Sequence, residues 1–581
     1  MKQWKRYKSY ILPYKSAFIL GPLMMVTEVL GEILLPKFMS MIINHGVAQK
    51  DGGYILKMGL VMAITSFLMA AGGILGAYFA AKASISFTSD LRRDLFARVQ
   101  QFSFKNIDTF STGSLVTRLT NDIQQVQNLI MMGLRMMLRA PGMFLGALVM
   151  AFWMNAELAA VILVVIPLLT AAIVWILRTA YPRFTAMQKA LDTLNSGIQE
   201  VLTNVRVVKS FVREDYEEKR FADTNRELKE AGLRALKIVI ATMPVMMFAM
   251  NVTTLAVVWF GGNLIIGGRM AVGDLTAFTT YIVQILMSLM MLSMVFLQSS
   301  RAMASIRRID EVLDEPIDLS DENASQKDRK VEKGRVEFKD VSFSYRDEPV
   351  LSHISLTAEP GETIGILGAT GSGKTSLVQL IPRLYDVTEG SVRVDGIDVR
   401  EYSLKNLRDG VGMVLQKNVL FSGTIEENLR WGDETATEEE VRRAAVYAQA
   451  DSFVNSFAEG YKTEMGQGGV NVSGGQKQRL CIARALLKKP KILILDDSTS
   501  AVDTATEAAI RTAFREDLKD TTKFIIAQRL SSLEYADRIL VLEDGRIIGE
   551  GTQEKLLASC EAYREIYETQ YGKRAAGEGM A

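Results

Sequence analysis

A glycine-rich segment in the second half of the chain has the residue types and spacing of a phosphate-binding loop. Residues 368–375 read GATGSGKT, which fits GxxxxGK[ST], between a strand-like segment and a helix-like one. In such a loop the glycines let backbone N–H groups surround a phosphate, Lys374 reaches the β- and γ-phosphates, and the Thr375 hydroxyl ligates Mg²⁺. The residues expected to bind nucleotide here are Gly368, Ala369, Thr370, Gly371, Ser372, Gly373, Lys374, Thr375 and Ser376.

Two adjacent carboxylates follow an apolar strand about 120 residues further along. Residues 492–495 read ILIL and are followed by Asp496 and Asp497. A strand that ends in acids can hold a magnesium ion beside a phosphate. Together with the upstream loop, these carboxylates predict a site for a nucleotide and Mg²⁺.

Between the loop and the acidic strand lies a short motif that resembles the signature of ATP-binding cassette (ABC) ATPases. Residues 472–476 read VSGGQ. Ser473 can cap a helix, while the two glycines allow the backbone to approach an anion closely. The resemblance implies that Ser473, Gly474, Gly475 and Gln476 contact the γ-phosphate of an ATP molecule bound by a partner cassette.

Further positions follow the order of the same family. The resemblance implies that Tyr345 stacks on adenine, that Gln416 contacts magnesium and water, and that Asp503 belongs to a loop that crosses to the partner. It also implies ATP and Mg²⁺ as the cofactors, with Thr375, Gln416 and Asp496 as the metal-binding residues.

At two positions the chain departs from the family pattern. Asp497 stands where the family has a glutamate that polarises the attacking water, and Gln528 stands where it has a histidine in a switch loop. The shorter carboxylate is retracted by about an ångström, and misplacement on that scale can cost about a hundredfold in rate. Glutamine cannot carry a proton or a positive charge. Both catalytic positions, Asp497 and Gln528, therefore predict slow hydrolysis.

An intact signature combined with a weakened base and switch is the pattern of one half of a heterodimeric ABC exporter. We expect this chain to carry the slow, degenerate ATP site and to complete the competent site of a second half-transporter that has the glutamate and the histidine. Two alternatives stay open at this point. One is a homodimeric exporter or lipid flippase that works with Asp497 and Gln528, and the other is an ATP-regulated membrane protein that does not pump.

The composition divides the 581 residues into an apolar, methionine-rich first half and a second half typical of an α/β protein. A membrane helix needs about 20 largely apolar residues. Six segments meet this requirement, at 14–36, 55–82, 132–153, 157–179, 236–261 and 274–298. The loops 83–131 and 180–235 are long and basic, which places them and both termini in the cytoplasm. The net charge of +1 gives no sign of nucleic-acid binding.

The predicted fold is an all-α, six-helix transmembrane domain of the ABC exporter type, with long intracellular helical extensions, fused to an α/β P-loop nucleotide-binding domain. The expected boundaries are 1–302 for the membrane domain, 303–334 for a charged linker, 335–571 for the nucleotide-binding domain and 572–581 for a disordered tail. The segments 110–122 and 200–221 resemble the two intracellular loops of ABC exporters. The resemblance implies a bacterial plasma membrane protein in contact with lipid.

Several residues of the predicted spans are candidates for a substrate cavity. Glu28 and Glu32 share one helix face, and acids within a membrane are functional candidates. They could attract a cationic substrate or form ion pairs with Arg135 and Arg139. Flexible thioethers suit a surface that accepts many apolar shapes, although a methionine stripe is more often packing. The candidate cavity residues are Glu28, Glu32, Met246, Met250, Met287, Met291 and Met294, for a hydrophobic small-molecule, lipid or peptide substrate.

Overall fold

The computed structural model describes residues 2–322, 324–345, 348–498 and 502–572, and it divides the chain into two compact units. The first unit comprises residues 1–99 and 113–314, and the second comprises residues 100–112 and 315–581. Residues 573–581, most of the tail expected to be disordered, lie outside the described residues.

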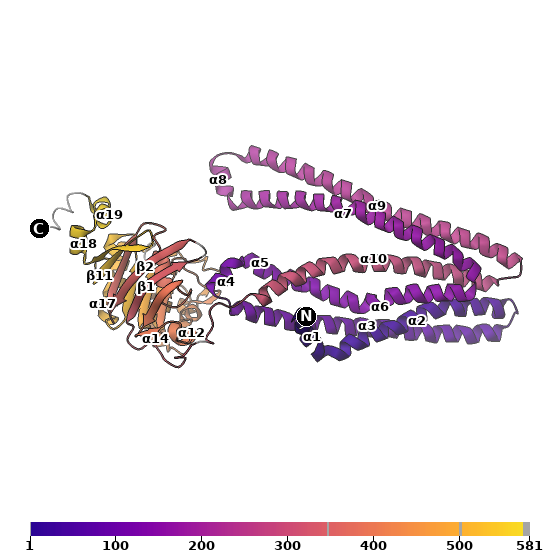
Figure 1. Ribbon diagram of the computed structural model, residues 1–581, viewed down its shortest axis with the longest axis horizontal. Helices are drawn as coiled ribbons and strands as arrows, with labels where there is room; N and C mark the ends of the chain where they lie inside the picture. The colour runs from indigo at the N-terminus through magenta and orange to yellow at the C-terminus, as the bar shows by residue number, and fades with distance from the viewer. Residues whose placement is uncertain (1, 323, 346–347, 499–501, 573–581) are drawn as a thin grey trace. The chain divides into compact units, whose positions relative to one another are not determined.

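Helices make up the first unit (Figure 1). Their bounds are α1 (Lys2–Ile11), η1 (Leu12–Tyr14), α2 (Lys15–Met41), η2 (Ile42–Val47), α3 (Gly52–Gln100), α5 (Thr112–Thr117), η3 (Arg118–Asp122), α6 (Ile123–Met154), α7 (Ala156–Thr203), α8 (Val205–Ser210), α9 (Glu214–Ile266) and α10 (Val272–Asp314). Among the described residues, six helical segments are long and apolar enough to cross a membrane, which confirms the six predicted spans.

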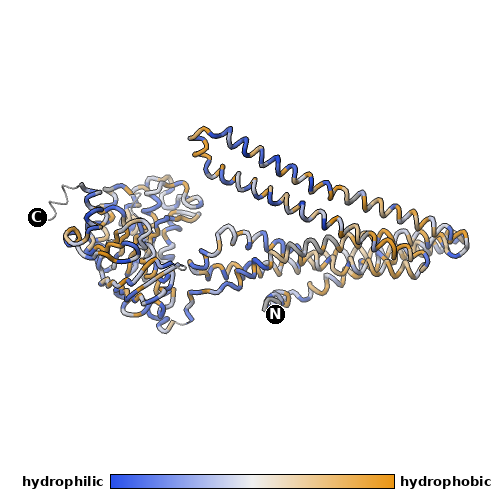
Figure 2. Tube along the Cα trace, turned by 45° about the horizontal axis from the view of Figure 1, so that its top comes forward, coloured by the Kyte–Doolittle hydropathy of each residue, from blue (hydrophilic) through white to orange (hydrophobic). Residues whose placement is uncertain are grey.

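Several of these helices are much longer than a membrane span. Helix α3 has 49 residues, which corresponds to a length of about 74 Å, whereas the hydrocarbon core of a bilayer is about 30 Å thick. Figure 2 shows that the hairpin of α7 and α9 is apolar in the part away from α8 and hydrophilic toward α8. The predicted continuation of the spans as helices beyond the membrane is therefore present.

Helices α7 and α9 pack along each other and are joined by the short helix α8 (Figure 1). The other long helices form a second group, in which α2, α6 and α10 are in contact. Fully buried side chains from α10, including Phe278 and Tyr281, lie in the core of this group, and the Tyr281 hydroxyl donates to the Ile33 carbonyl at 2.8 Å. Large apolar side chains thus form the core of this group, and the polar end of Tyr281 is hydrogen-bonded.

The linker expected at 303–334 is shorter than predicted. Helix α10 continues to Asp314, so residues 303–314 are helical and belong to the first unit. The reason is a buried stripe at helical spacing, formed by Ala302, Ser305, Ile309 and Val312. The Ser305 hydroxyl also donates to the buried Asp122 carboxylate at 2.8 Å. Asp310, one of the charged residues that suggested a linker, is itself buried and accepts hydrogen bonds from Arg6 and Tyr7.

The second unit contains a six-stranded sheet in the order β12-β11-β3-β10-β9-β6, in which only the pairing of β11 with β12 is antiparallel. An antiparallel sheet in the order β2-β1-β4-β5 and a two-stranded pair β7-β8 accompany it. The strands are β1 (Val336–Ser344), β2 (Pro349–Ala358), β3 (Thr363–Gly368), β4 (Glu389–Val394), β5 (Ile397–Asp398), β6 (Val411–Val414), β7 (Gly423–Thr424), β8 (Glu464–Met465), β9 (Ile492–Asp496), β10 (Thr522–Ile526), β11 (Arg538–Glu543) and β12 (Arg546–Gly551).

Helices flank these sheets and complete the predicted α/β domain. Their bounds are α4 (Phe104–Thr109), α11 (Lys374–Gln379), α12 (Leu404–Asp409), α13 (Ile425–Arg430), α14 (Glu438–Tyr447), α15 (Asp451–Val454), α16 (Gly474–Leu487), α17 (Thr504–Asp517), α18 (Gln553–Ser559) and α19 (Glu561–Tyr571), with short η4 (Gly460–Lys462) and η5 (Leu530–Ser532). Because β3, β9 and β10 are parallel neighbours, the segments that follow them meet at one edge of the sheet.

Candidate functional site

The glycine-rich segment forms a tight loop between β3 and α11. Gly371 and Gly373 have φ angles of +88° and +92°, a backbone conformation that glycine adopts without strain. A Cβ atom on Gly373 would also lie 2.7 Å from the Leu351 side chain. These two positions therefore require glycine. Gly373 is the second glycine of the GxxxxGK[ST] motif, so its backbone conformation explains why the motif has glycine there.

Lys374 is held inside this loop. Its ammonium donates to the carbonyls of Gly368 at 2.8 Å and Ala369 at 2.6 Å. Burial lowers the pKa of Lys374, and the nearby Asp496 and Asp497 carboxylates act in the opposite direction. The loop thus keeps one cation directed at the place where the motif predicts a phosphate.

Asp496 is the last residue of β9 and is almost fully buried. Its carboxylate accepts a hydrogen bond from the Thr375 hydroxyl at 3.1 Å, and burial raises the pKa of Asp496. Gln416 lines the same cavity as these two side chains. Hydroxyl, amide and carboxylate oxygens are ligands that suit Mg²⁺, so the residues present fit the ion that the motif implies.

The two residues that depart from the family pattern contact each other. The Gln528 amide donates to the Asp497 carboxylate at 3.0 Å. Asp497 has a φ angle of +48°, and its N–H donates to the carbonyl of Ile526 at 3.0 Å. Burial raises the pKa of Asp497, while the charges of Lys374 and Arg529 lower it. The sequence showed two independent substitutions, whereas the structure makes them one hydrogen-bonded pair.

One cavity of about 330 Å³ brings most of the predicted nucleotide-binding residues together. It is lined by Tyr345, Val350, Thr370, Gly371, Gly373, Lys374, Thr375, Ser376, Gln416, Asp496, Asp497, Ile526 and Gln528. Gly368, Ala369 and Ser372 belong to the same loop, and the Ser372 side chain is buried. The nucleotide-binding motifs, which lie between Tyr345 and Gln528 in the sequence, therefore converge on a single pocket.

Tyr345 is connected to the segment 100–112 through a second tyrosine. Its hydroxyl shares a hydrogen bond of 2.9 Å with the Ser376 hydroxyl. The Tyr345 ring packs edge to face on the Tyr385 ring, with ring centroids 5.1 Å apart. The Tyr385 ring also packs on that of Phe104 in α4, with ring centroids 6.0 Å apart. The Tyr385 hydroxyl donates to the Asp108 carboxylate at 2.9 Å. No sequence motif marks Tyr385 as a functional residue.

The signature residues are placed at the start of α16. Ser473 caps this helix: its hydroxyl accepts from the Gln476 N–H, and the Gln476 side chain accepts from the Ser473 N–H at 2.9 Å. Ser473 and Gly474 are exposed, whereas the following Gln478 is buried and donates to the Asp497 carbonyl at 3.3 Å. Helix α16 therefore presents the Ser-Gly-Gly turn outward and is anchored beside Asp497. None of the signature residues lines the 330 Å³ cavity of their own chain.

Asp503 is exposed and caps the next helix, α17, by accepting from the Thr506 N–H at 3.0 Å. This hydrogen bond to the backbone lowers the pKa of Asp503. Like the signature, Asp503 lies outside the cavity that holds Lys374.

The acids of the first span are in ion pairs. Arg139 of α6 contacts Glu28 at 3.1 Å and Glu32 at 2.8 Å, so the structure shows the pairing that competed with substrate binding in the sequence analysis. Arg135, the other predicted partner, forms no ion pair with a described residue and lines a small cavity on α6. Met250 and Met291 are half-buried and Met287 is exposed. The side chains of Met246 and Met294 lie outside the described part of the chain.

The Arg139 ion pairs make a test of stability possible. Arg139→Gln is expected to lower the free energy of unfolding by about 3 kcal/mol, because it leaves two neighbouring, largely buried carboxylates without a counter-charge. The measurement is thermal unfolding of the purified chain in detergent. Arg135→Gln on the same helix is the matched control and should shift the transition much less. Equal shifts would contradict a structural role specific to Arg139.

Comparison with known proteins places both halves of the chain. Residues 18–289 match the family model of the ABC transporter transmembrane region, and residues 351–500 match the family model described as ABC transporter. The chain is 41% identical to the ABC transporter ATP-binding protein YfiB of Bacillus subtilis, over 98% of this chain and 99% of that protein. It is 32% identical to the ATP-dependent lipid A-core flippase of Desulfotalea psychrophila, over 97% and 99% of the two chains. A solved bacterial Atm1-family ABC exporter with ATP bound has a TM-score of 0.76, at 28% identity over 95% of this chain and 98% of that one.

Proposed function

Because the chain belongs to the ABC transporter family as an exporter-type half-transporter, we propose that it is the subunit of a heterodimeric exporter that carries the slow, degenerate ATP site. Its signature would complete the competent site of a partner subunit. The observation that carries this proposal is the hydrogen bond between Gln528 and Asp497 in the nucleotide pocket.

Asp497 occupies the position from which a family member polarises water. Its carboxylate is one methylene shorter than glutamate, and it accepts a hydrogen bond from an amide that cannot take up or release a proton. A general base must lie within hydrogen-bond reach of the water from which it takes a proton. Retraction of the carboxylate and its engagement by Gln528 both oppose that role. The site built on this chain's own loop should therefore bind ATP and turn it over slowly.

The remaining residues of the pocket are suited to bind the nucleotide. Lys374 and the backbone N–H groups of the loop would bind the phosphates, and Tyr345 would stack on adenine. Thr375, Gln416 and Asp496 would hold Mg²⁺, which neutralises phosphate charge when bound. These residues explain binding without requiring that hydrolysis be fast.

The signature supports a partner because it is intact and points away from its own pocket. Ser473 and Gly474 are exposed at the start of α16, where a second cassette can reach them. The hydrogen bond from Gln478 to the Asp497 carbonyl ties this helix to the strand end of its own site. A conformational change at one ATP site would therefore be felt at the signature that serves the other site.

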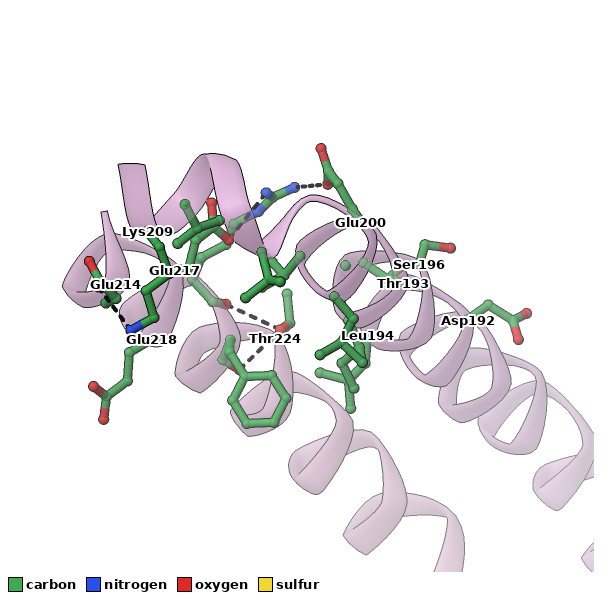
Figure 3. Close-up of a pocket in the computed structure, with 18 residues that line it drawn as sticks. Asp192, Thr193, Leu194, Ser196, Glu200, Lys209, Glu214, Glu217, Glu218 and Thr224 are labelled. Atoms are coloured by element: carbon green, nitrogen blue, oxygen red, sulfur yellow. Dashed lines mark hydrogen bonds and ion pairs between the residues drawn. The ribbon is translucent and has the colours of Figure 1, made fainter. Parts of the chain in front are cut away.

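Helix α8 provides a second surface suited to a partner. The apolar side chains of Val207, Phe211 and Val212 at this end of the hairpin are 55%, 72% and 81% exposed. A cavity of about 810 Å³ is lined by residues of α7, α8 and α9, with Glu214, Glu217 and Glu218 among them (Figure 3). Residues 100–112, which overlap the predicted intracellular loop 110–122 only at its start, belong to the second unit of their own chain. We infer that α8 docks on the partner's nucleotide-binding domain.

The membrane unit supports export of hydrophobic or amphipathic compounds. Its spans are apolar, and Glu28 and Glu32 are paired with Arg139. One group of relatives is named for flipping a lipid, lipid A-core. We propose a multidrug or lipid-like substrate, and a bacterial plasma membrane location with both termini in the cytoplasm, because the long basic loops favour the cytoplasmic side.

The direct test is steady-state ATP hydrolysis in lipid by this chain alone and by the chain purified together with the half-transporter encoded beside it. The proposal expects activity close to background for the chain alone and robust activity for the pair. Robust activity of the chain alone would overturn the degenerate-site assignment, because Asp497 and Gln528 would then suffice, and a homodimeric exporter or flippase would replace it.

Restoring the family residues should activate the slow site. In a pair whose competent site is disabled by Ser473→Asp in this chain, the double change Asp497→Glu with Gln528→His is expected to raise residual ATP hydrolysis at least about tenfold, since both base and switch are restored. Each single change should raise ATP hydrolysis less. Asp497→Glu alone leaves Gln528 at the switch position, and Gln528→His alone leaves the shorter carboxylate at the base position. No increase from the double change would mean that other residues make the site slow.

A further inference from the structure

A second polar cleft of about 410 Å³ lies on the nucleotide-binding unit, on the other side of the sheet from the nucleotide pocket. Ile525 of β10 lines this cleft, whereas its neighbour Ile526 lines the nucleotide pocket. Successive residues of a strand point to opposite faces of a sheet, so β10 separates the two cavities. Among the described residues, none lines both cavities. The cleft is therefore not an extension of the ATP site.

Positive charge dominates the cleft. Arg511, Arg515, Lys519 and Lys523 line it, against the two acids Glu534 and Asp537. Within the described part of the chain, none of the four cations is in an ion pair. The Asp537 carboxylate accepts from the Thr363 N–H at 2.8 Å and is engaged by the backbone. The lining thus carries two more positive than negative charges.

Lys523 is the most unusual of these residues because it is only 4% exposed. Its ammonium has three N–H donors and donates to the carbonyls of Thr521 at 2.7 Å and Gly361 at 3.5 Å. Burial lowers the pKa of Lys523, while the charges of Asp537 and Asp520 oppose the shift. No described carboxylate lies within ion-pair distance of Lys523, and burying an unpaired cation is unfavourable, so an anion from outside the chain would stabilise this residue.

The Arg511 side chain is held in a fixed position by hydrogen bonds. Its guanidinium donates to the carbonyls of Glu507 and Ser531, and it lies 5.7 Å from the centre of the Tyr535 ring. Both Tyr535 and Arg511 line the cleft, and Tyr535 is 56% exposed. Guanidinium groups held in a fixed orientation match the oxygens of phosphate better than a mobile cation does.

We propose that this cleft binds a small phosphate-bearing anion at a site distinct from the ATP pocket. A net lining charge of +2 suits a dianionic phosphate group, and a volume of about 410 Å³ leaves room for an organic portion next to the Tyr535 ring. Arg515 and Lys519 lie at the opening, and Lys523 lies at the base of the site. Nothing in the ATP-driven export proposed above requires this second ligand.

The test uses the full chain in detergent, with Lys374→Ala introduced to remove the main cation of the ATP pocket, and pyrophosphate as the probe in isothermal titration calorimetry without nucleotide or Mg²⁺. We expect saturable binding at one site. Adding Arg515→Gln with Lys519→Gln should weaken it at least about tenfold, because two charged contacts are lost. Both substitutions are at exposed positions, so the fold should be retained, as equal unfolding temperatures would show.

The matched control is Lys405→Gln with Arg443→Gln. These two residues are exposed on the same unit, form no ion pair with a described residue and remove the same charge. They should leave pyrophosphate affinity unchanged. Absence of saturable binding, or an equal loss in both double variants, would overturn the proposal, since the attraction would then be a property of the whole surface. Either result is independent of whether the chain works in a heterodimer.

Discussion

Replacing Ser473 with aspartate in this chain is expected to lower ATP hydrolysis by the assembled pair at least about a hundredfold, the scale seen when a single donor to a developing charge is removed. Aspartate is as good a helix cap as serine, so α16 should keep its start. The substitution removes a hydroxyl donor and places a carboxylate where the partner's γ-phosphate is expected. The loss would thus report on electrostatics at the partner's site rather than on folding.

Two controls make this result specific. Thr552→Asp introduces the same charge at the exposed cap of α18, where Thr552 accepts from the Lys555 N–H, and it should leave hydrolysis unchanged. Asp497→Asn, which alters the degenerate site, should change the activity of the pair less than about twofold if that site contributes little turnover. A loss from Asp497→Asn as large as that from Ser473→Asp would contradict the asymmetric model.

Lys374→Ala should abolish nucleotide binding by the chain alone, with the affinity for a fluorescent ATP analogue lowered at least about a hundredfold. Among the described residues that line the pocket, Lys374 is the one cation, and two carbonyls of the loop fix the position of its ammonium. Equilibrium binding in detergent measures the effect directly and does not depend on hydrolysis.

Lys405→Ala is the control for Lys374→Ala, because it removes an exposed lysine of the same unit that lies outside the pocket. Its affinity for the analogue should equal that of the unaltered chain. If Lys374→Ala also bound the analogue normally, the glycine-rich loop would not be the nucleotide-binding element, and both the ATP site and its degenerate character would have to be abandoned.

The sequence was sufficient for the features that depend on local pattern. Six apolar segments predicted six spans, and the phosphate loop and acidic strand predicted residues that meet in one pocket. The charged residues predict a linker that begins at residue 303, whereas helix α10 continues to Asp314. Ile309 and Val312 continue a buried stripe that a count of charges does not reveal.

Contacts between segments that are distant in the chain could not be predicted from the sequence. The bond between Gln528 and Asp497 depends on β9 and β10 being parallel neighbours, with Ile526 opposite Asp496. The choice of Arg139 over Arg135 as the partner of Glu28 depends on how α2 and α6 are rotated against each other. The basic cleft gathers residues from several segments around β10, and its cations follow no short motif.

The contacts that connect α4 to Tyr345 through Tyr385 have a thermodynamic consequence. Tyr385 contacts Phe104 and Asp108 on one side and Tyr345 on the other. If adenine stacking on Tyr345 favours one position of Tyr385, then nucleotide affinity and attachment of the segment 100–112 are coupled equilibria. Coupling free energies are reciprocal. Detaching this segment would then lower nucleotide affinity by the same factor by which bound nucleotide strengthens its attachment.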